Sequence, residues 1–199
     1  MKRKLRLIIV LLLISSKIIV AQDGFFSKFF FPNTYGMSYP LNNSQLKRNT
    51  IISNGFEYRF ENKTPLFIRF SIENLWLDYE IENNSQTNAT NSELRINGYY
   101  LGAGLRTNTD KWRFLVLVQG GNANYKYPVV ESSGSNYKVI YNKENSFSCQ
   151  TVLGIEYYFT KDFALIAESF YILIPASNSF WNSNFQNIGL KLGITTTLF

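Results

Sequence analysis

The chain has 199 residues, of which 17% are aromatic and 17% charged, with one cysteine and no histidine. The absence of histidine removes the commonest general base and the commonest metal ligand, and the single Cys149 cannot form an internal disulfide. The excess of 20 Lys+Arg over 14 Asp+Glu does not indicate nucleic-acid binding, because it arises largely from five basic residues near the N-terminus, Lys2, Arg3, Lys4, Arg6 and Lys17.

Residues 1–21 have the pattern of a secretory signal peptide. A basic start precedes an apolar stretch from Leu5 to Ile14, and Ala21 offers a small residue for cleavage. The apolar stretch is too short for a transmembrane helix, and no cysteine follows it to carry a lipid anchor. We therefore predict an exported protein with a lead segment at residues 22–32. Its run of phenylalanines is either an interfacial anchor or, as we favour, an approach to the first strand.

The rest of the chain alternates between apolar and polar residues, the period of a β-strand with two different faces. The last strand is the clearest example, because Ile188, Leu190, Leu192 and Ile194 share one face. Breaks in the alternation at Asn-, Gly- and Pro-containing segments mark turns. The predicted strands are about 33–41, 51–60, 66–81, 93–106, 112–130, 137–159, 163–174 and 185–199.

Eight strands joined by alternating long and short connections indicate a transmembrane barrel, since such barrels have short periplasmic turns and longer outer loops. We therefore predict an all-β fold, an eight-stranded antiparallel up-and-down transmembrane β-barrel, over residues 33–199. Aromatic residues beside the short turns and at the C-terminus predict a periplasmic aromatic girdle made of Phe60, Phe67, Trp112, Phe159, Phe163 and Phe199.

Alternation alone does not say which face points inward, and a soluble ligand-binding barrel would bury its apolar face. We favour the membrane arrangement, because the polar face holds small residues and charges of both signs that could pair inside a narrow barrel. This luminal charge network has two interpretations, a gated ion path or, as we favour, a polar plug that stabilises the barrel. Its predicted members are Glu57, Arg59, Arg69, Glu73, Arg95, Arg113, Glu156, Glu168 and Lys191.

The hairpin formed by the fifth and sixth strands is much longer than the roughly 9–11 residues that a membrane strand needs. It should project from the membrane with Tyr125, Tyr127, Tyr137 and Tyr141 near its upper part. Either it is a sticky edge to which a partner protein adds a strand, or it is an ordinary surface hairpin. Cys149 lies on the apolar face of the sixth strand, where an inert lipid-facing thiol is expected.

The segment from Gly154 to Leu165 combines a glycine, an aromatic run, a short turn and the start of an apolar strand, which contains Glu168 further on. This pattern resembles small OmpA/OmpX-type outer-membrane β-barrels. It is particularly similar to the porin-like barrel family common in Bacteroidota. The resemblance implies a location in the cell outer membrane, contact with outer-membrane lipid, and delivery by the barrel insertion machinery.

Catalytic motifs do not stand out in this sequence. Without histidine there is no Ser-His pair, and neither a phosphate-binding loop nor a dinucleotide motif is present. We therefore expect no enzyme and no cofactor, but a structural, adhesive or porin-like role with a polar, largely plugged lumen. The alternatives are an accessory component of a secretion or motility machine and, less favoured, a lipid-modifying enzyme.

Overall fold

The computed structural model describes residues 26–41, 46–60, 65–81, 90–107, 109, 111–133, 136–175 and 184–197. The predicted signal peptide, residues 1–21, and Phe199 lie outside the described residues. None of the helices within the described ranges is long and apolar enough to cross a bilayer. After a short 3-10 helix, the chain forms eight strands: η1 (Phe26–Lys28), β1 (Phe29–Pro40), β2 (Leu46–Arg59), β3 (Leu66–Ile81), β4 (Thr90–Arg106), β5 (Trp112–Ser133), β6 (Asn136–Thr160), β7 (Phe163–Ile174) and β8 (Phe185–Thr197).

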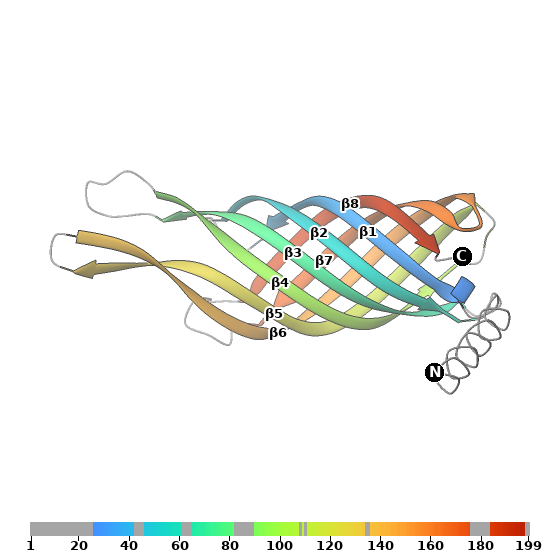
Figure 1. Cartoon of the computed structure of the whole chain (residues 1–199), viewed down its shortest axis with the longest axis horizontal. Helices are drawn as coiled ribbons and strands as arrows, with labels where there is room; N and C mark the ends of the chain where they lie inside the picture. Colours follow the sequence, from blue (N-terminus) through green and yellow to red (C-terminus); the bar gives the residue numbers. More distant parts are fainter. Residues whose placement is uncertain are drawn as a thin grey trace, which may run out of the picture.

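Each strand pairs with the next, and β1 pairs with β8, so the sheet closes into a barrel without an edge. All neighbours are antiparallel, which confirms the predicted all-β, eight-stranded fold. The start of β1 and the end of β8 lie at one end, here called the terminal end, and β5 and β6 project together at the opposite, hairpin end (Figure 1).

Two features of the prediction are wrong, the start of the first strand and the order of long and short connections. Residues 29–32 belong to β1 and not to a lead segment, because Phe29 and Phe31 continue the outward alternation of that strand and pack against Phe56 at 5.0 and 5.4 Å between ring centroids. The expected order of long and short connections is also incorrect. β2 already starts at Leu46, and only two residues separate β5 from β6, so the strands lengthen at the hairpin end instead of the loops.

A largely apolar surface surrounds the outside of the barrel. Leu190 and Leu192 are 67% and 69% exposed, and the residues between them and on either side point inward. The same outward alternation runs through all eight strands, including Tyr35, Phe70, Leu101, Val118, Leu153 and Leu165. A surface of this kind suits hydrocarbon and not water, because monomeric soluble proteins rarely expose large contiguous apolar patches.

Towards the hairpin end the apolar face changes sides. On β3 the outward residues run from Leu66 to Ile72 and are followed by Asn74, whereas the inward Leu75 and Leu77 are buried. The change occurs at the same level on the neighbouring strands, because Asn74 pairs with Asn97, which pairs with Asn124. Beyond this row of asparagines the barrel therefore has an apolar core and a polar exterior, including Leu94, Ile96, Tyr125, Tyr127, Ile172, Ile174 and Phe185 in the core.

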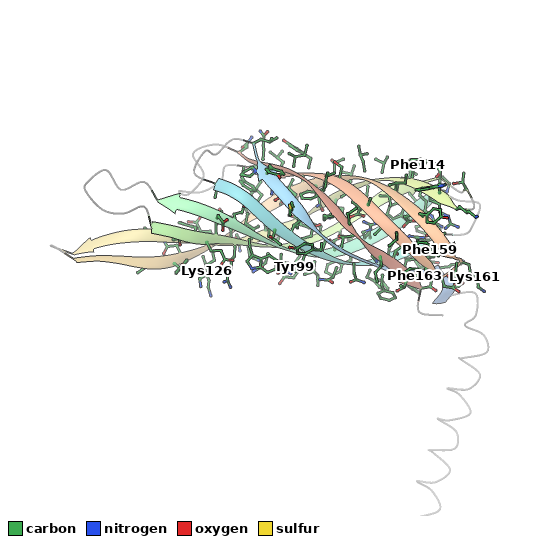
Figure 2. All side chains as sticks on the ribbon, turned by 90° about the horizontal axis from the view of Figure 1, so that it is seen from above. Tyr99, Phe114, Lys126, Phe159, Lys161 and Phe163 are labelled. Atoms are coloured by element: carbon green, nitrogen blue, oxygen red, sulfur yellow. The ribbon has the colours of Figure 1, made fainter. Side chains whose placement is uncertain are left out.

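Aromatic side chains gather at the terminal end, where Phe159 and Phe163 lie near Lys161 and Phe114 lies on the other side of the barrel (Figure 2). Trp112, Phe159 and Phe163 are exposed, and Tyr157 links two of them, with ring centroids 4.6 Å from Trp112 and 5.0 Å from Phe159. Phe60 is half-buried and packs on the edge of Tyr58. Phe67 is not a girdle residue. It is fully buried and points into the barrel, where its ring lies 5.6 Å from the Arg69 guanidinium.

Candidate functional site

A continuous chain of ion pairs fills the inside of the barrel. It runs from Glu156 through Arg59, Glu57, Arg69, Glu168 and Lys191 to Glu73, with alternating charges and a bridge at every step. Every member is at most 3% exposed at the side chain. We call these seven residues the ion-pair chain.

Strand register places neighbouring members of the ion-pair chain opposite each other. Glu57 on β2 is the direct partner of Arg69 on β3, and Glu168 on β7 is the direct partner of Lys191 on β8. Cross-strand neighbours on one face of a sheet lie close enough for such pairs. Arg59 and Glu57 pair along the same strand, two residues apart. The other three bridges join strands that are not neighbours in the sheet, so long side chains must span the barrel interior to form them.

Three bridges cross the interior. Arg59 on β2 reaches Glu156 on β6, with 2.5 Å between Nη2 and Oε1. Arg69 on β3 reaches Glu168 on β7 at 2.5 Å, and Lys191 on β8 reaches Glu73 on β3 at 2.7 Å. Because charges removed from water must be compensated by partners, these bridges hold opposite walls of the barrel together.

Neutral side chains complete the two ends of the ion-pair chain. At the terminal end, the Tyr158 hydroxyl accepts a hydrogen bond from Arg59 and donates one of 2.9 Å to Glu156, while the Phe30 ring lies 3.5 Å from the Arg59 guanidinium. At the other end, Gln150 donates to Glu73 at 2.9 Å. The carboxylates at both ends therefore have partners beyond the ion pairs.

Two predicted members of the charge network do not belong to the ion-pair chain. Arg95 points outward beyond the asparagine row, where it is 56% exposed and pairs with Glu93. Arg113 is half-exposed at the terminal end, donates from Nε to the Thr109 carbonyl at 3.1 Å and lies 4.1 Å over the Tyr158 ring. Arg113 makes no ion pair with a carboxylate of the described residues.

Arg106 was not predicted and lies inside the barrel. It is 8% exposed, its guanidinium lies 5.9 Å from the Phe30 ring, and its Nη1 has no hydrogen-bond partner among the described residues. The alternation of Tyr99, Leu101, Ala103 and Leu105 towards the outside would have assigned Arg106, and not Arg95, to the interior face.

The projecting β5–β6 hairpin is the second candidate site. β5 pairs with β4 only as far as Lys126, and β6 pairs with β7 only from Cys149, yet β5 and β6 stay paired up to Ser133 and Asn136. Beyond these pairs neither edge of the ribbon forms a ladder with another described strand, and Lys126 marks where the ribbon leaves the barrel wall (Figure 2).

The base of the hairpin is anchored by tyrosines. Tyr125 and Tyr127 are almost fully buried and donate hydrogen bonds of 3.2 and 2.7 Å to Glu144. Tyr141 is 47% exposed, lies under the Lys126 ammonium at 4.6 Å and bonds to Ser92 of β4. Tyr125 and Tyr127 are thus core residues that stiffen the base of the ribbon, and Tyr141 is available at its surface.

No protein-family model matches the sequence, and a search of characterised proteins finds no related sequence. Comparison with solved structures finds Neisserial surface protein A at 12% identity and a TM-score of 0.60, covering 86% of this chain and 97% of that protein. Ail, the attachment invasion locus protein of Yersinia pestis, crystallised with the heparin analogue sucrose octasulfate, has 12% identity, a TM-score of 0.49 and coverages of 84% and 95%. The N-terminal barrel domain of Pseudomonas aeruginosa OprF has 12% identity, a TM-score of 0.42 and coverages of 84% and 97%.

These proteins are small outer-membrane barrels of eight strands. At 12% identity the likeness to Neisserial surface protein A shows a shared fold and nothing about activity. The fold of this chain is therefore that of a small outer-membrane β-barrel.

Proposed function

We propose that this protein is an adhesive outer-membrane β-barrel, exported by its signal peptide, in which the barrel is a membrane anchor and the β5–β6 hairpin binds a partner outside the cell. The observation that carries the proposal is a two-stranded ribbon that continues well beyond the barrel wall, where neither of its edges forms a ladder with another described strand. Unpaired strand edges offer rows of N–H and C=O groups to an added strand. We infer that the partner is a protein segment in extended conformation.

The composition of the ribbon supports binding and not membrane insertion. Its outward residues include Lys126, Lys143 and Asn145, all polar, on the same face as the exposed Tyr141. Tyrosine at a surface supplies a large contact area with little loss of side-chain freedom. A rigid base and a polar surface with an exposed tyrosine together favour recognition over a purely structural role.

Removal of the hairpin tip tests the proposed adhesive role. Replacing residues 129–140 by Asn-Gly, which favours a two-residue turn, should leave the barrel folded and abolish adhesion of cells that carry the protein. Folding is checked by the heat-induced mobility shift in gels, and adhesion by counting bound cells. A matched control exchanges Lys111 and Lys161 for Gln, which changes exposed charges at the opposite end of the barrel without shortening the ribbon. Undiminished adhesion of the shortened variant would contradict the proposal.

A porin-like role is the second candidate, and the ion-pair chain argues for a largely plugged lumen. An eight-stranded barrel has little more interior space than its own side chains fill. Three bridges cross that space, and Arg59 and Glu156 are at most 2% exposed at the side chain. We therefore infer that water and ions pass only when the bridges break.

The wild-type protein is expected to show no porin-sized, steady conductance in planar bilayers. Glu168→Ala should raise the frequency of small conductance steps, because it removes a partner from both Arg69 and Lys191. Glu93→Ala, which removes an exposed carboxylate beyond the barrel's apolar surface, is the control and should behave as wild type. A large stable conductance of the wild-type monomer would show that the lumen is open water.

The resemblance of Gly154–Leu165 to OmpA/OmpX-type barrels supports a further proposal, that the chain belongs to the porin-like barrels of Bacteroidota. Its contacts are then outer-membrane lipid and the barrel insertion machinery. A role as an accessory component of a secretion or motility machine would use the same hairpin, and crosslinking in intact membranes would reveal it. A lipid-modifying activity has no support from a nucleophile–base pair in the described residues.

A further inference from the structure

Two asparagines interrupt the apolar outside of the barrel. Asn33 on β1 and Asn54 on β2 are direct register partners, and both side chains are exposed on the outward face. Their outward neighbours in register are Ile194 on β8 and Ile72 on β3, which are 40% and 36% exposed. A pair of carboxamides thus lies in the middle of an apolar surface.

The pair does not mark the edge of that surface. Along β1, the aromatic Phe29 and Phe31 lie on its terminal side, and Tyr35, Met37 and Tyr39, all about half-exposed, lie on its hairpin side. The polar boundary on the neighbouring β3 comes only at Asn74, beyond Ile72, which pairs with Asn54. In a membrane the two amides would therefore face hydrocarbon, where an unpaired amide is costly.

Local structure explains one of the amides only in part. Pro32 has no N–H to give to the β1–β2 ladder, and the paired residues of the two strands pass from Phe30 to Asn33 at this point. The Asn33 Nδ2 donates to the Phe31 carbonyl at 3.1 Å, which satisfies an acceptor beside this gap. The Asn33 side-chain Oδ1 and the Asn54 carboxamide form no hydrogen bond with any described residue.

A hollow of about 580 Å³ lies on the same outer face, next to the asparagines. Its walls include Tyr35 and Met37 on β1, Leu190 on β8 and, from β7, the small Ser169. Tyr35 lies two residues from Asn33 on the same face of β1, so the hollow begins where the amide pair ends. On the other side of the pair, Ile52 and Ile72 present aliphatic side chains at a similar level, because Ile52 pairs with Tyr35.

We propose that a second copy of this chain covers the β8–β1–β2–β3 face and forms a dimer in the membrane. Carboxamides are self-complementary, because each offers N–H donors and a carbonyl acceptor. A two-fold axis along the membrane normal brings the Asn33–Asn54 pair of one copy against the same pair of the other, as an isologous interface requires. That operation also keeps residues at their level in the membrane, so Ile52 and Ile72 of the second copy meet the hollow.

The inference rests on the proposed membrane location and is independent of the hairpin's role. The test uses the full mature chain carrying Cys149→Ser and Lys161→Cys, so that residue 161 in the exposed turn takes the dye. One sample is labelled with a donor dye and another with an acceptor dye, and the two are reconstituted together into phosphatidylcholine vesicles. Energy transfer measured over a series of lipid-to-protein ratios gives the association constant. Transfer should exceed that of randomly dispersed monomers and should fall on dilution with lipid as a dimer–monomer equilibrium.

Three variants identify the interface. Asn54→Leu should lower the association constant about tenfold or more, because each dimer loses amide hydrogen bonds from both copies. Ser169→Trp should also weaken association, because it fills the hollow. Thr151→Leu, which removes an exposed hydroxyl from the opposite wall on β6, is the matched control and should associate as wild type. Because Asn54→Leu removes an amide from hydrocarbon, its unfolding midpoint should not fall, so lost transfer cannot reflect misfolding.

The outcomes separate the two proposals. Failure of the protein to float with the vesicles would overturn the membrane location, and this inference with it. Stable insertion with transfer no greater than random would overturn only the dimer and show that lipid alone covers this face. Transfer in Asn54→Leu equal to wild type would likewise overturn the proposed interface.

Discussion

Replacement of Arg69 by Met should lower the free energy of unfolding by about 3–5 kcal/mol, the cost of leaving a buried charge without its partner. Arg69 stands at the centre of the ion-pair chain, where it bonds to Glu57 at 2.8 Å and to Glu168 at 2.5 Å. Its removal leaves two carboxylates undercompensated in the barrel interior. Urea titrations of the protein in lipid vesicles, followed by tryptophan fluorescence, measure the change.

Two controls show whether the loss comes from the stranded charges. Arg95→Met removes an exposed arginine with one exposed partner, and such surface changes usually stay within about 0.5 kcal/mol. In the triple variant Arg69→Met, Glu57→Gln and Glu168→Gln, the stranded carboxylates become neutral amides, so much of the lost stability should return. A loss of equal size in the single and triple variants would mean that Arg69 contributes through packing, for example against Phe67, and not through charge.

The outward face of the barrel could be predicted from the sequence because contact with lipid would constrain each outward residue separately. Lipid demands an apolar side chain at every second position, and strands such as β8 satisfy this demand without interruption. The bounds of β3 and β7 follow equally well, since Pro65, the Lys161–Asp162 turn and Pro175 interrupt the alternation sharply.

The interior could not be predicted as reliably, because long side chains choose partners across the barrel. Nothing in the sequence links Arg59 to Glu156, which lie on strands that are not neighbours in the sheet. The inclusion of Arg95 reflects a different cause. Beyond Asn97 the apolar residues of β4 change from odd positions such as Leu101 to the even positions Leu94 and Ile96, so taking apolar residues as outward along the whole strand places Arg95 inside.

The change of face also gives the hairpin end an apolar core of its own. Leu75, Leu77 and Leu94 are at most 3% exposed inside the barrel, beyond the row of asparagines. Burying such a side chain contributes about 1.5–3 kcal/mol. The barrel therefore combines a charged interior within an apolar outer surface and an apolar interior within a polar one. The signal in the sequence was the break at Asn74, where the apolar residues of β3 switch from even to odd positions.

Leu153→Arg should make folding into a membrane less favourable by about 2–4 kcal/mol, because arginine on the lipid face is most costly near the bilayer midplane. Leu153 is 56% exposed on β6, between Ile155 and Thr151 on the same outward face. The same strand carries an ideal comparison. Asn145 is exposed on that face too, but it lies in the projecting hairpin, beyond the last β6–β7 pair at Cys149.

Asn145→Arg should therefore have almost no effect, since the new charge remains in water. Folding titrations of both variants into vesicles from urea measure the difference, and strand, face and introduced residue are the same in the two. A similar loss at both positions would mean that the substitution disturbs β6 itself, and a tolerated Leu153→Arg would mean that water and not lipid surrounds the apolar surface. If both variants lose stability equally, Leu192→Arg on β8 replaces Leu153→Arg as the test, because the Leu192 side chain is 69% exposed. If lipid covers Leu192, the arginine should destabilise the folded barrel by about 2–4 kcal/mol. If water covers it, stability should not change.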